Sequence, residues 1–360
     1  MLLLARSAGE WRDRLAAAEP AVRELLAGAD GDEPLATAVS AELSNEDLLA
    51  AAVPVFATAF GTDPPGRVVT DAGPGAVRVL DLHAAALVAV LRAGGAGRLV
   101  RVSADDVLDE LLGHEQRFWQ GSAARAGLLG GPIGMDAGTL RQVVAAGALL
   151  GAASQEQVVE LLARVPGAVA SVSVARWLRD LYPPDSGAAN GTEWLGSLRP
   201  DRLAERLVVA ELTASEELAR RCLSGLDERQ ALRAVTLLGR AAADQQEAAE
   251  VLLEWVLPLL ERVIARLPAD LGVLTAISDA IPYPSTALAE ADLTVTRRIL
   301  QIVPDGDGEL LARWLHWLGI ALAQTGSPAE ALLPTQKAVA IQRELAAAYP
   351  APTPTSTGPT

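Results

Sequence analysis

The sequence has only one cysteine and three histidines among its 360 residues. The single thiol, Cys222, cannot form an internal disulfide, a CxxC redox pair or a thiolate-rich metal site. The histidines are His83, His114 and His316, and none has the second histidine four residues away that a zinc-protease helix requires. We also find no nucleophile beside a base of the kind that triad catalysis needs. The sequence therefore predicts neither a metal centre nor a catalytic residue.

Aromatic residues and long apolar runs are also scarce. Aromatic side chains make up 4% of the chain and hydrophobic residues 50%, so a core of leucine, alanine and valine is expected, which favours helices over sheets. No run approaches the ~20 apolar residues of a membrane span. The longest, residues 143–153, is expected to be a buried helix, and the apolar residues 2–5 are too few for a signal peptide. We therefore expect a cytoplasmic protein with no membrane contact.

Positive charge is limited as well. The formal net charge of −15 argues against a nucleic-acid partner, because such affinity depends on neutralising phosphates. Lys337 is the single lysine, so the chain lacks the Gly-x4-Gly-Lys-Ser/Thr loop that binds nucleotide phosphates. Residues 69–71 and 102–106 imitate the end of a Walker B strand, and we interpret both as turns or helix caps. The chain alone is thus expected to bind no cofactor.

The clearest pattern in the chain lies at residues 311–346. Two helical periodicities are separated there by TGSP at 325–328, which supplies a stop glycine, a capping serine and a first-turn proline. Gly319 and Ala331 place small residues where two helices would approach closely. The pattern predicts a helical hairpin. Its apolar positions are Leu315, Leu318 and Leu322 in the first helix, and Leu332, Ala338 and Ile341 in the second.

Similar positions recur upstream of this hairpin. The pairs Leu238-Gly239, Ile277-Ser278 and Leu318-Gly319 follow one another at steps of roughly 40 residues, a spacing typical of helical repeats. One hairpin cannot bury its apolar face alone, so we predict three stacked helix pairs over residues 226–348. Second helices of these pairs are expected at 246–266 and 285–302.

The remaining periodic segments also predict helices. Ser44 is expected to cap the first of them. Three helices over 137–182, followed by an extended segment, are typical of a winged-helix module. The expected helices are 46–60, 77–92, 107–119, 137–150, 155–165, 173–182 and 201–212.

Residues 2–11 (LLLARSAGEW) resemble the strand and sensor arginine that follow the Walker B segment in actinobacterial STAND-type (NB-ARC/NACHT-like) regulatory NTPases. Residues 83–92 resemble the helical lid of that family. RWLRDLY at 176–182 and LRPDRLAE at 198–205 resemble its winged helix, and the sequence from IPYPS at 281–285 onward resembles its tetratricopeptide repeats. The resemblance implies a mainly α fold and a signalling role.

The resemblance divides the chain into five segments. Arg6 matches the nucleotide sensor, but ATP or ADP binding and ATPase activity would require a P-loop domain that this chain does not contain. The segments are a nucleotide-binding remnant at 1–30, a helical lid region at 31–133, a winged-helix-like module at 134–224, tetratricopeptide-like repeats at 225–349, and a disordered Pro/Thr-rich tail at 350–360.

A partner surface is expected on the last helix pair. In tetratricopeptide arrays the inner face of the first helix lines a groove for peptides or for the protein's own domains. Here that stripe contains Arg313, His316 and Ile320, flanked by Trp314 and Trp317. We expect these five residues to bind a protein or peptide, although they also fit ordinary packing and surface roles.

Three functions compete at this point. The leading hypothesis is a non-catalytic regulatory module in which the repeats bind protein or peptide partners. The alternative is a transcription regulator that uses the winged helix on DNA, with the repeats as an effector-sensing domain. Few basic residues occupy 137–150 and 155–165, which argues against it. An enzyme built on surface carboxylates ranks last, because undirected carboxylates are usually solvated helix faces.

Overall fold

The computed structural model describes residues 44–70, 79–93, 99–103, 106–130, 134–184, 193–244 and 252–348. Within these ranges the chain forms fourteen α-helices, one π-helical turn and two short strands, so the fold is mainly α as the composition predicts. The expectations for residues 1–30, including Arg6, and for the tail at 350–360 lie outside the described residues. The chain divides into two compact units, Met1–Glu110 and Leu111–Thr360.

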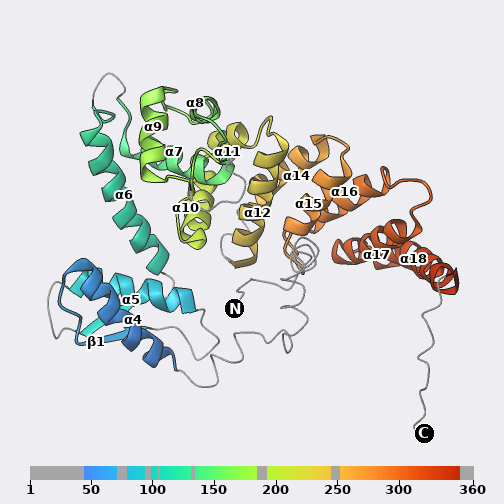
Figure 1. Ribbon diagram of the computed structural model, residues 1–360, viewed down its shortest axis with the longest axis horizontal. Coiled ribbons are helices and arrows are strands. Elements are labelled where there is room, and N and C mark those ends of the chain that lie inside the picture. Colours follow the sequence, from blue (N-terminus) through green and yellow to red (C-terminus); the bar gives the residue numbers. More distant parts are fainter. Residues whose placement is uncertain are drawn as a thin grey trace, which may run out of the picture. The chain divides into compact units, whose positions relative to one another are not determined.

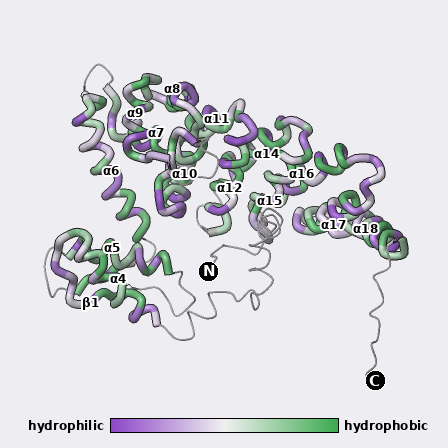
Figure 2. The backbone as a smooth tube through the Cα atoms, in the orientation of Figure 1, coloured by the Kyte–Doolittle hydropathy of each residue, from purple (hydrophilic) through white to green (hydrophobic). Residues whose placement is uncertain are grey.

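The first unit begins with the helix predicted after Ser44. In α4 (Asn45–Phe60) the Ser44 hydroxyl accepts a hydrogen bond from the Asp47 backbone, and the Asp47 carboxylate accepts one from the Ser44 backbone, which forms a capping box. The helix ends at Gly61, whose φ of 63° is the left-handed conformation that favours glycine. α5 (Val79–Ala93) packs against α4. It is mainly hydrophobic along its length (Figure 2) and forms the core of this unit.

A short parallel sheet completes the first unit and corrects part of the sequence interpretation. β1 (Arg67–Thr70) pairs in parallel with β2 (Leu99–Val102), so Thr70 and Val102 end strands, where we expected turns or helix caps. Each strand has four residues, too few to show a clear alternation of apolar and polar residues. The two strands are also separated in the sequence by a whole helix, α5. A local pattern therefore did not reveal the pairing.

The helices predicted over 137–182 are confirmed in the second unit. Side chains of Asp136, Ser154 and Ser171 accept hydrogen bonds from backbone N–H groups of the first turns, so each helix has an N-cap. The apolar run predicted to be buried lies mostly in α7, which packs against four later helices. The elements of this part are α6 (Val107–Arg125), which runs across the boundary between the units, α7 (Ala137–Leu150), α8 (Gln155–Leu162), α9 (Val172–Leu181) and α10 (Asp201–Ala214).

Polar groups hold α6 against α9. The Trp119 indole donates to the Tyr182 hydroxyl at 2.6 Å, and that hydroxyl donates to the Glu115 carboxylate at 3.3 Å. Burial raises the pKa of both Tyr182 and Glu115. Beyond α9, the extended segment forms one antiparallel bridge between Ala152 and Leu195. A Cβ atom at Gly147 of α7 would also meet the Leu195 side chain, at 3.3 Å, so the segment lies against the end of α7.

The later helices of this unit follow one another in chain order (Figure 1). α12 packs on α15, α14 on α16, and α16 on α17, while α17 and α18 pack along each other. Thr325, Gly326 and Ser327 separate α17 from α18, which confirms the predicted hairpin. These elements are α11 (Glu216–Cys222), α12 (Glu228–Asp244), the π-helical turn η1 (Leu252–Val256), α14 (Leu257–Arg266), α15 (Leu271–Ala280), α16 (Ala289–Leu300), α17 (Gly308–Gln324) and α18 (Pro328–Ala348).

The three small residues that suggested a repeat do not all face the same neighbour. A Cβ atom at Gly319 would meet Thr335 of α18, the second helix of its own pair. Ser278 likewise bonds to Asp292 of its own second helix, α16. A Cβ atom at Gly239 would instead meet Leu288, in the following pair, at 2.9 Å. At Gly319 and Ser278 the close contact thus lies within one helix pair, and at Gly239 it lies between two successive pairs.

Candidate functional site

The predicted partner stripe on α17 lies largely at the surface. Arg313 and His316 are exposed, while Trp317 and Ile320 are half-buried. The Trp317 ring meets the Tyr283 ring edge to face, with 5.7 Å between ring centroids and an interplanar angle of 82°. Tyr283 precedes α16 and is 62% exposed. The structure therefore adds an aromatic residue from the neighbouring helix pair to the stripe.

Trp314 is placed differently from the other predicted residues. Its side chain is 1% exposed, so it belongs to the core. Its indole nitrogen has no hydrogen-bond partner among the residues that the structure describes, and the Arg313 guanidinium lies 5.4 Å from the centre of its ring. Adjacent side chains on a helix diverge by about 100°, so an inward Trp314 accompanies an outward Arg313. Four of the five predicted residues are thus accessible to a partner.

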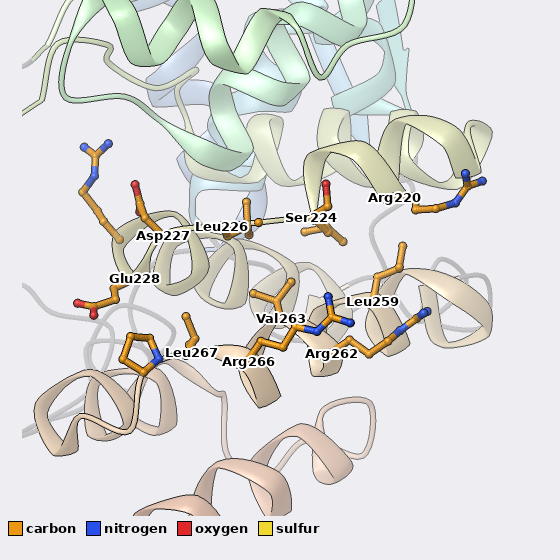
Figure 3. Close-up of a pocket in the computed structure, with 14 residues that line it drawn as sticks. Arg220, Ser224, Leu226, Asp227, Glu228, Leu259, Arg262, Val263, Arg266 and Leu267 are labelled. Carbon is orange, nitrogen blue, oxygen red and sulfur yellow. The ribbon is translucent and has the colours of Figure 1, made fainter.

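A hollow of about 760 Å³ lies between the turn joining α11 to α12 and the helix α14 (Figure 3). Its apolar floor includes Leu223, Val263 and Leu267, which are buried. Leu226 and Leu259 are half-buried and extend this floor. The volume is within the range of small-molecule sites, roughly 300–1,000 Å³. We call this hollow the arginine groove, after the residues on its rim.

Three exposed arginines form one side of the arginine groove. Arg220 comes from the end of α11, and Arg262 and Arg266 come from α14. In the view of Figure 3 the guanidinium groups of Arg262 and Arg266 are directed to the same side as Arg220. Asp227 and Glu228 lie on the opposite side in that view. A fourth arginine of the lining, Arg229, donates to the Gln157 side chain at 2.9 Å. The groove therefore has three arginines on one side, two carboxylates on the other and an apolar floor.

The helices α11 and α14 end at the groove, and backbone carbonyls at both ends accept hydrogen bonds from arginines outside the groove. Beyond α11, Arg164 donates to the carbonyl of Ser224 at 2.9 Å and to those of Cys222 and Gly225 at 3.3 Å. At the end of α14, Arg298 donates to the carbonyls of two residues of the last turn. The carbonyls that Arg298 reaches are those of Ile264 and Leu267. The rim arginines are therefore not needed to cap these helix ends.

A second hollow, of about 350 Å³, lies among α7, α10 and α12. Arg233 donates to the carbonyl of Ala148 and to the carboxylate of Glu193, each at 3.1 Å. Burial lowers the pKa of Arg233, and Arg240 pairs with Asp201 at 3.2 Å. These bonds join three helices, so we interpret this hollow as a structural junction.

The groups best suited to chemistry elsewhere are either buried or isolated. Burial raises the pKa of the Cys222 thiol to about 12, so it carries no thiolate near neutral pH. His83 packs against Phe56 with 6.4 Å between ring centroids, and His316 is exposed on α17. Burial also lowers the pKa of His114. Among the described residues, no group of three or more His, Cys, Asp or Glu side chains is placed to hold a metal ion.

In the described ranges, no helix is both long enough and apolar enough to cross a bilayer. Comparisons with models of known families, with curated proteins and with solved structures find no match for this chain.

The arginine groove was not predicted from the sequence, although one signal for it was present. Arg262 and Arg266 stand four residues apart, so they share a helix face next to Leu259 and Val263. Two like charges at that spacing without an interposed carboxylate are unfavourable and mark a face worth examining. Arg220 is far away in the sequence, and only the packing of α11 near α14 places it on the same rim.

Proposed function

We propose that this chain is a non-catalytic regulatory module whose C-terminal helix pairs bind a protein or peptide partner. In this proposal α12 to α18 form a tetratricopeptide-like solenoid and residues 134–224 form a winged-helix-like module, as in STAND-type signalling NTPases. The packing of α12 on α15 and of α14 on α16 supports a stack, because equivalent helices of successive pairs touch. The same helices would then carry both stability and recognition.

The single observation that carries the proposal is the surface formed by α17 and Tyr283. An exposed tyrosine and a half-buried tryptophan meet edge to face there across two helix pairs, beside exposed Arg313 and His316. Tyrosine, tryptophan and arginine are the residues that most often dominate binding energy at protein interfaces. Aromatic side chains with few rotatable bonds also lose little entropy when a partner binds. Tyr283, Arg313, His316, Trp317 and Ile320 are thus the proposed contact residues.

A displayed peptide library selected on the full chain tests this proposal. Selected peptides should lose about tenfold or more in affinity for the Trp317→Ala variant, since hot-spot truncations cost about 2 kcal/mol or more. Arg176→Ala, an exposed arginine on α9, serves as the control and should leave affinity unchanged. Equal binding to both variants would reject the α17 surface. Micromolar binding of MgATP to the same chain, followed by turnover, would contradict the non-catalytic part.

The DNA-binding alternative has less support from the described residues. Arg176 is exposed on α9, but the guanidinium of Arg179 lies 4.7 Å from the ring centre of Trp194, and Asp180 is exposed beside them. A cation stacked on an indole and a neighbouring carboxylate make a poor face for phosphates. A gel shift at low salt decides between the two functions, because retardation that weakens with salt would favour DNA binding.

A further inference from the structure

We propose that the arginine groove is a binding site for an amphipathic organic anion, a molecule with an apolar body and a carboxylate or phosphate head. This site is separate from the α17 surface and goes beyond the partner-binding function proposed above. The anionic head would lie between Arg220, Arg262 and Arg266, and the apolar body would cover the leucine floor. Three further features of the groove support this ligand.

Two of the three rim arginines, Arg262 and Arg266, have no carboxylate partner among the described residues. Arg220 has a long contact of 3.5 Å to Glu216, and both side chains are more than half exposed. Arg262 donates through its Nε to the carbonyl of Pro258, which leaves its two terminal nitrogens for other partners. Among the described residues, no ion pair joins Arg262 or Arg266 to a carboxylate. This is unusual in a chain with a net charge of −15, where carboxylates outnumber basic groups.

One of the two acidic residues that line the groove, Asp227, is engaged in a helix cap. The Asp227 carboxylate accepts a hydrogen bond of 2.8 Å from the Gln230 backbone, and the Gln230 side chain accepts one from the Asp227 backbone. This reciprocal cap fixes Asp227 at the start of α12, away from Arg220, Arg262 and Arg266 in Figure 3. The carboxylates of Asp227 and Glu228 disfavour an anionic head beside them, so a bound anion would have one preferred orientation.

The groove is held in shape before any ligand arrives. Arg164 fixes the turn after α11 through three carbonyls, and Arg298 fixes the end of α14 through two. Rigid walls reduce the entropy lost on binding. Because Arg298 already serves the carbonyls at the end of α14, the charge of Arg262 and Arg266 is available to a ligand. Guanidinium groups bind carboxylate and phosphate oxygens through paired hydrogen bonds.

Calorimetric titration of the full chain with decanoate and with decyl phosphate tests the site. Each should bind with one molecule per chain, and the affinity should fall as salt is added. The comparison of the two heads shows whether carboxylate or phosphate is preferred. Decyltrimethylammonium, which has the same body and a cationic head, should bind at least about tenfold more weakly, and so should acetate and inorganic phosphate, which lack the body.

Substitutions locate the ligand. Arg262→Gln and Arg266→Gln should each weaken decanoate binding roughly three- to tenfold, as expected for one charge-assisted contact at a partly exposed site. Leu259→Gln should weaken it by a similar factor because it makes the floor polar. Arg176→Gln and Arg343→Gln remove the same charge from exposed positions on α9 and α18, and they should have no effect.

Several results would reject the proposal. Failure of both decanoate and decyl phosphate to bind would do so, and so would equal binding of the cationic analogue. Inorganic phosphate that binds as well as decyl phosphate would show a plain anion site and remove the role of the floor. Equal affinity of the rim variants and the control variants would place the ligand elsewhere. Because Tyr283 and Trp317 lie outside the groove, a Trp317→Ala chain should still bind decanoate, which separates this site from the α17 surface.

Discussion

The helices α7 and α18 share an alanine- and leucine-rich composition but have very different surroundings. In α7 nine of fourteen residues are buried, whereas in α18 only Ala331, Pro334 and Ala338 of twenty-one residues are buried. Leu332 and Leu333 of α18 are each 60% exposed. The number of helices packed around an element, rather than its own composition, thus decides what its side chains contribute.

The difference follows from position in the unit. α7 contacts α8, α10 and α12, so its side chains are enclosed on most sides. α18 packs along α17, and no comparable contact joins it to another described helix. Hydrophobic stabilisation depends on the apolar area removed from water. The same leucine should therefore matter greatly in α7 and very little in α18.

The largest effect is expected at Leu149 of α7. This side chain is fully buried, so Leu149→Ala should lower the free energy of unfolding by about 2–5 kcal/mol through lost burial and a residual cavity. Urea denaturation followed by circular dichroism measures it. A loss below about 1 kcal/mol would show that α7 is not enclosed as described.

The next effect tests how firmly the turn after α11 is held. Arg164→Ala removes the donors to three backbone carbonyls and should lower stability by about 1–3 kcal/mol. Cys222 supplies a direct readout, since it is buried and burial raises the pKa of its thiol to about 12. Its reaction with a thiol reagent should be very slow in the native chain and faster in the variant.

A control variant shows whether faster labelling of Cys222 is specific to the loss of Arg164. Arg221→Ala changes an exposed arginine of the same helix, α11, and should leave the labelling rate of Cys222 within about twofold. If the two variants label equally fast, Arg164 does not hold the turn.

The sequence predicted the local structure of this chain well and its long-range structure poorly. The helices of 137–182 and the hairpin of α17 and α18 were predictable because caps, turn residues and apolar periodicity all lie within a few positions of one another. The pairing of β1 with β2 depends on two four-residue strands separated by α5. No short pattern encodes such a contact.

The candidate sites show the same division. Periodicity placed Arg313 and His316 on one exposed stripe, but it did not distinguish them from the buried Trp314 next to them. Tyr283 and the rim of the arginine groove could not be predicted, because each is formed by separate helices that come together only in the fold. Sequence alone can find a helix face, and only the fold shows which face remains open.

Substitution of Asp292 in α16 should have an effect on stability between those expected at Leu149 and at Leu333. It is 8% exposed, and burial raises its pKa to about 6, although a hydrogen bond from Ser278 opposes the shift. The unfolded pKa is about 3.9, so between about pH 4 and pH 6 the folded state binds more protons than the unfolded state. Stability contributed by this group therefore falls as the pH rises through that window.

Substitution of Asp292 by asparagine should remove this pH dependence. Asp292→Asn has no charge to bury, so at pH 7 it should be more stable than the parent chain by about 1 kcal/mol, a rise in Tm of about 2–4 °C. At pH 4 the two chains should melt together. Thermal melts at both values measure this, and a variant that is less stable at pH 7 would mean that the Asp292 carboxylate has a favourable partner there.

The smallest effect is expected at Leu333 of α18, the counterpart of Leu149. Since its side chain is mostly exposed in the folded chain, Leu333→Ser removes little buried area and should change the free energy of unfolding by less than about 0.5 kcal/mol. Urea denaturation of the full chain provides the comparison with Leu149→Ala. A loss above about 1 kcal/mol would mean that the outer face of α18 is covered in solution, and a dependence of that loss on protein concentration would identify a second copy of the chain as the cover.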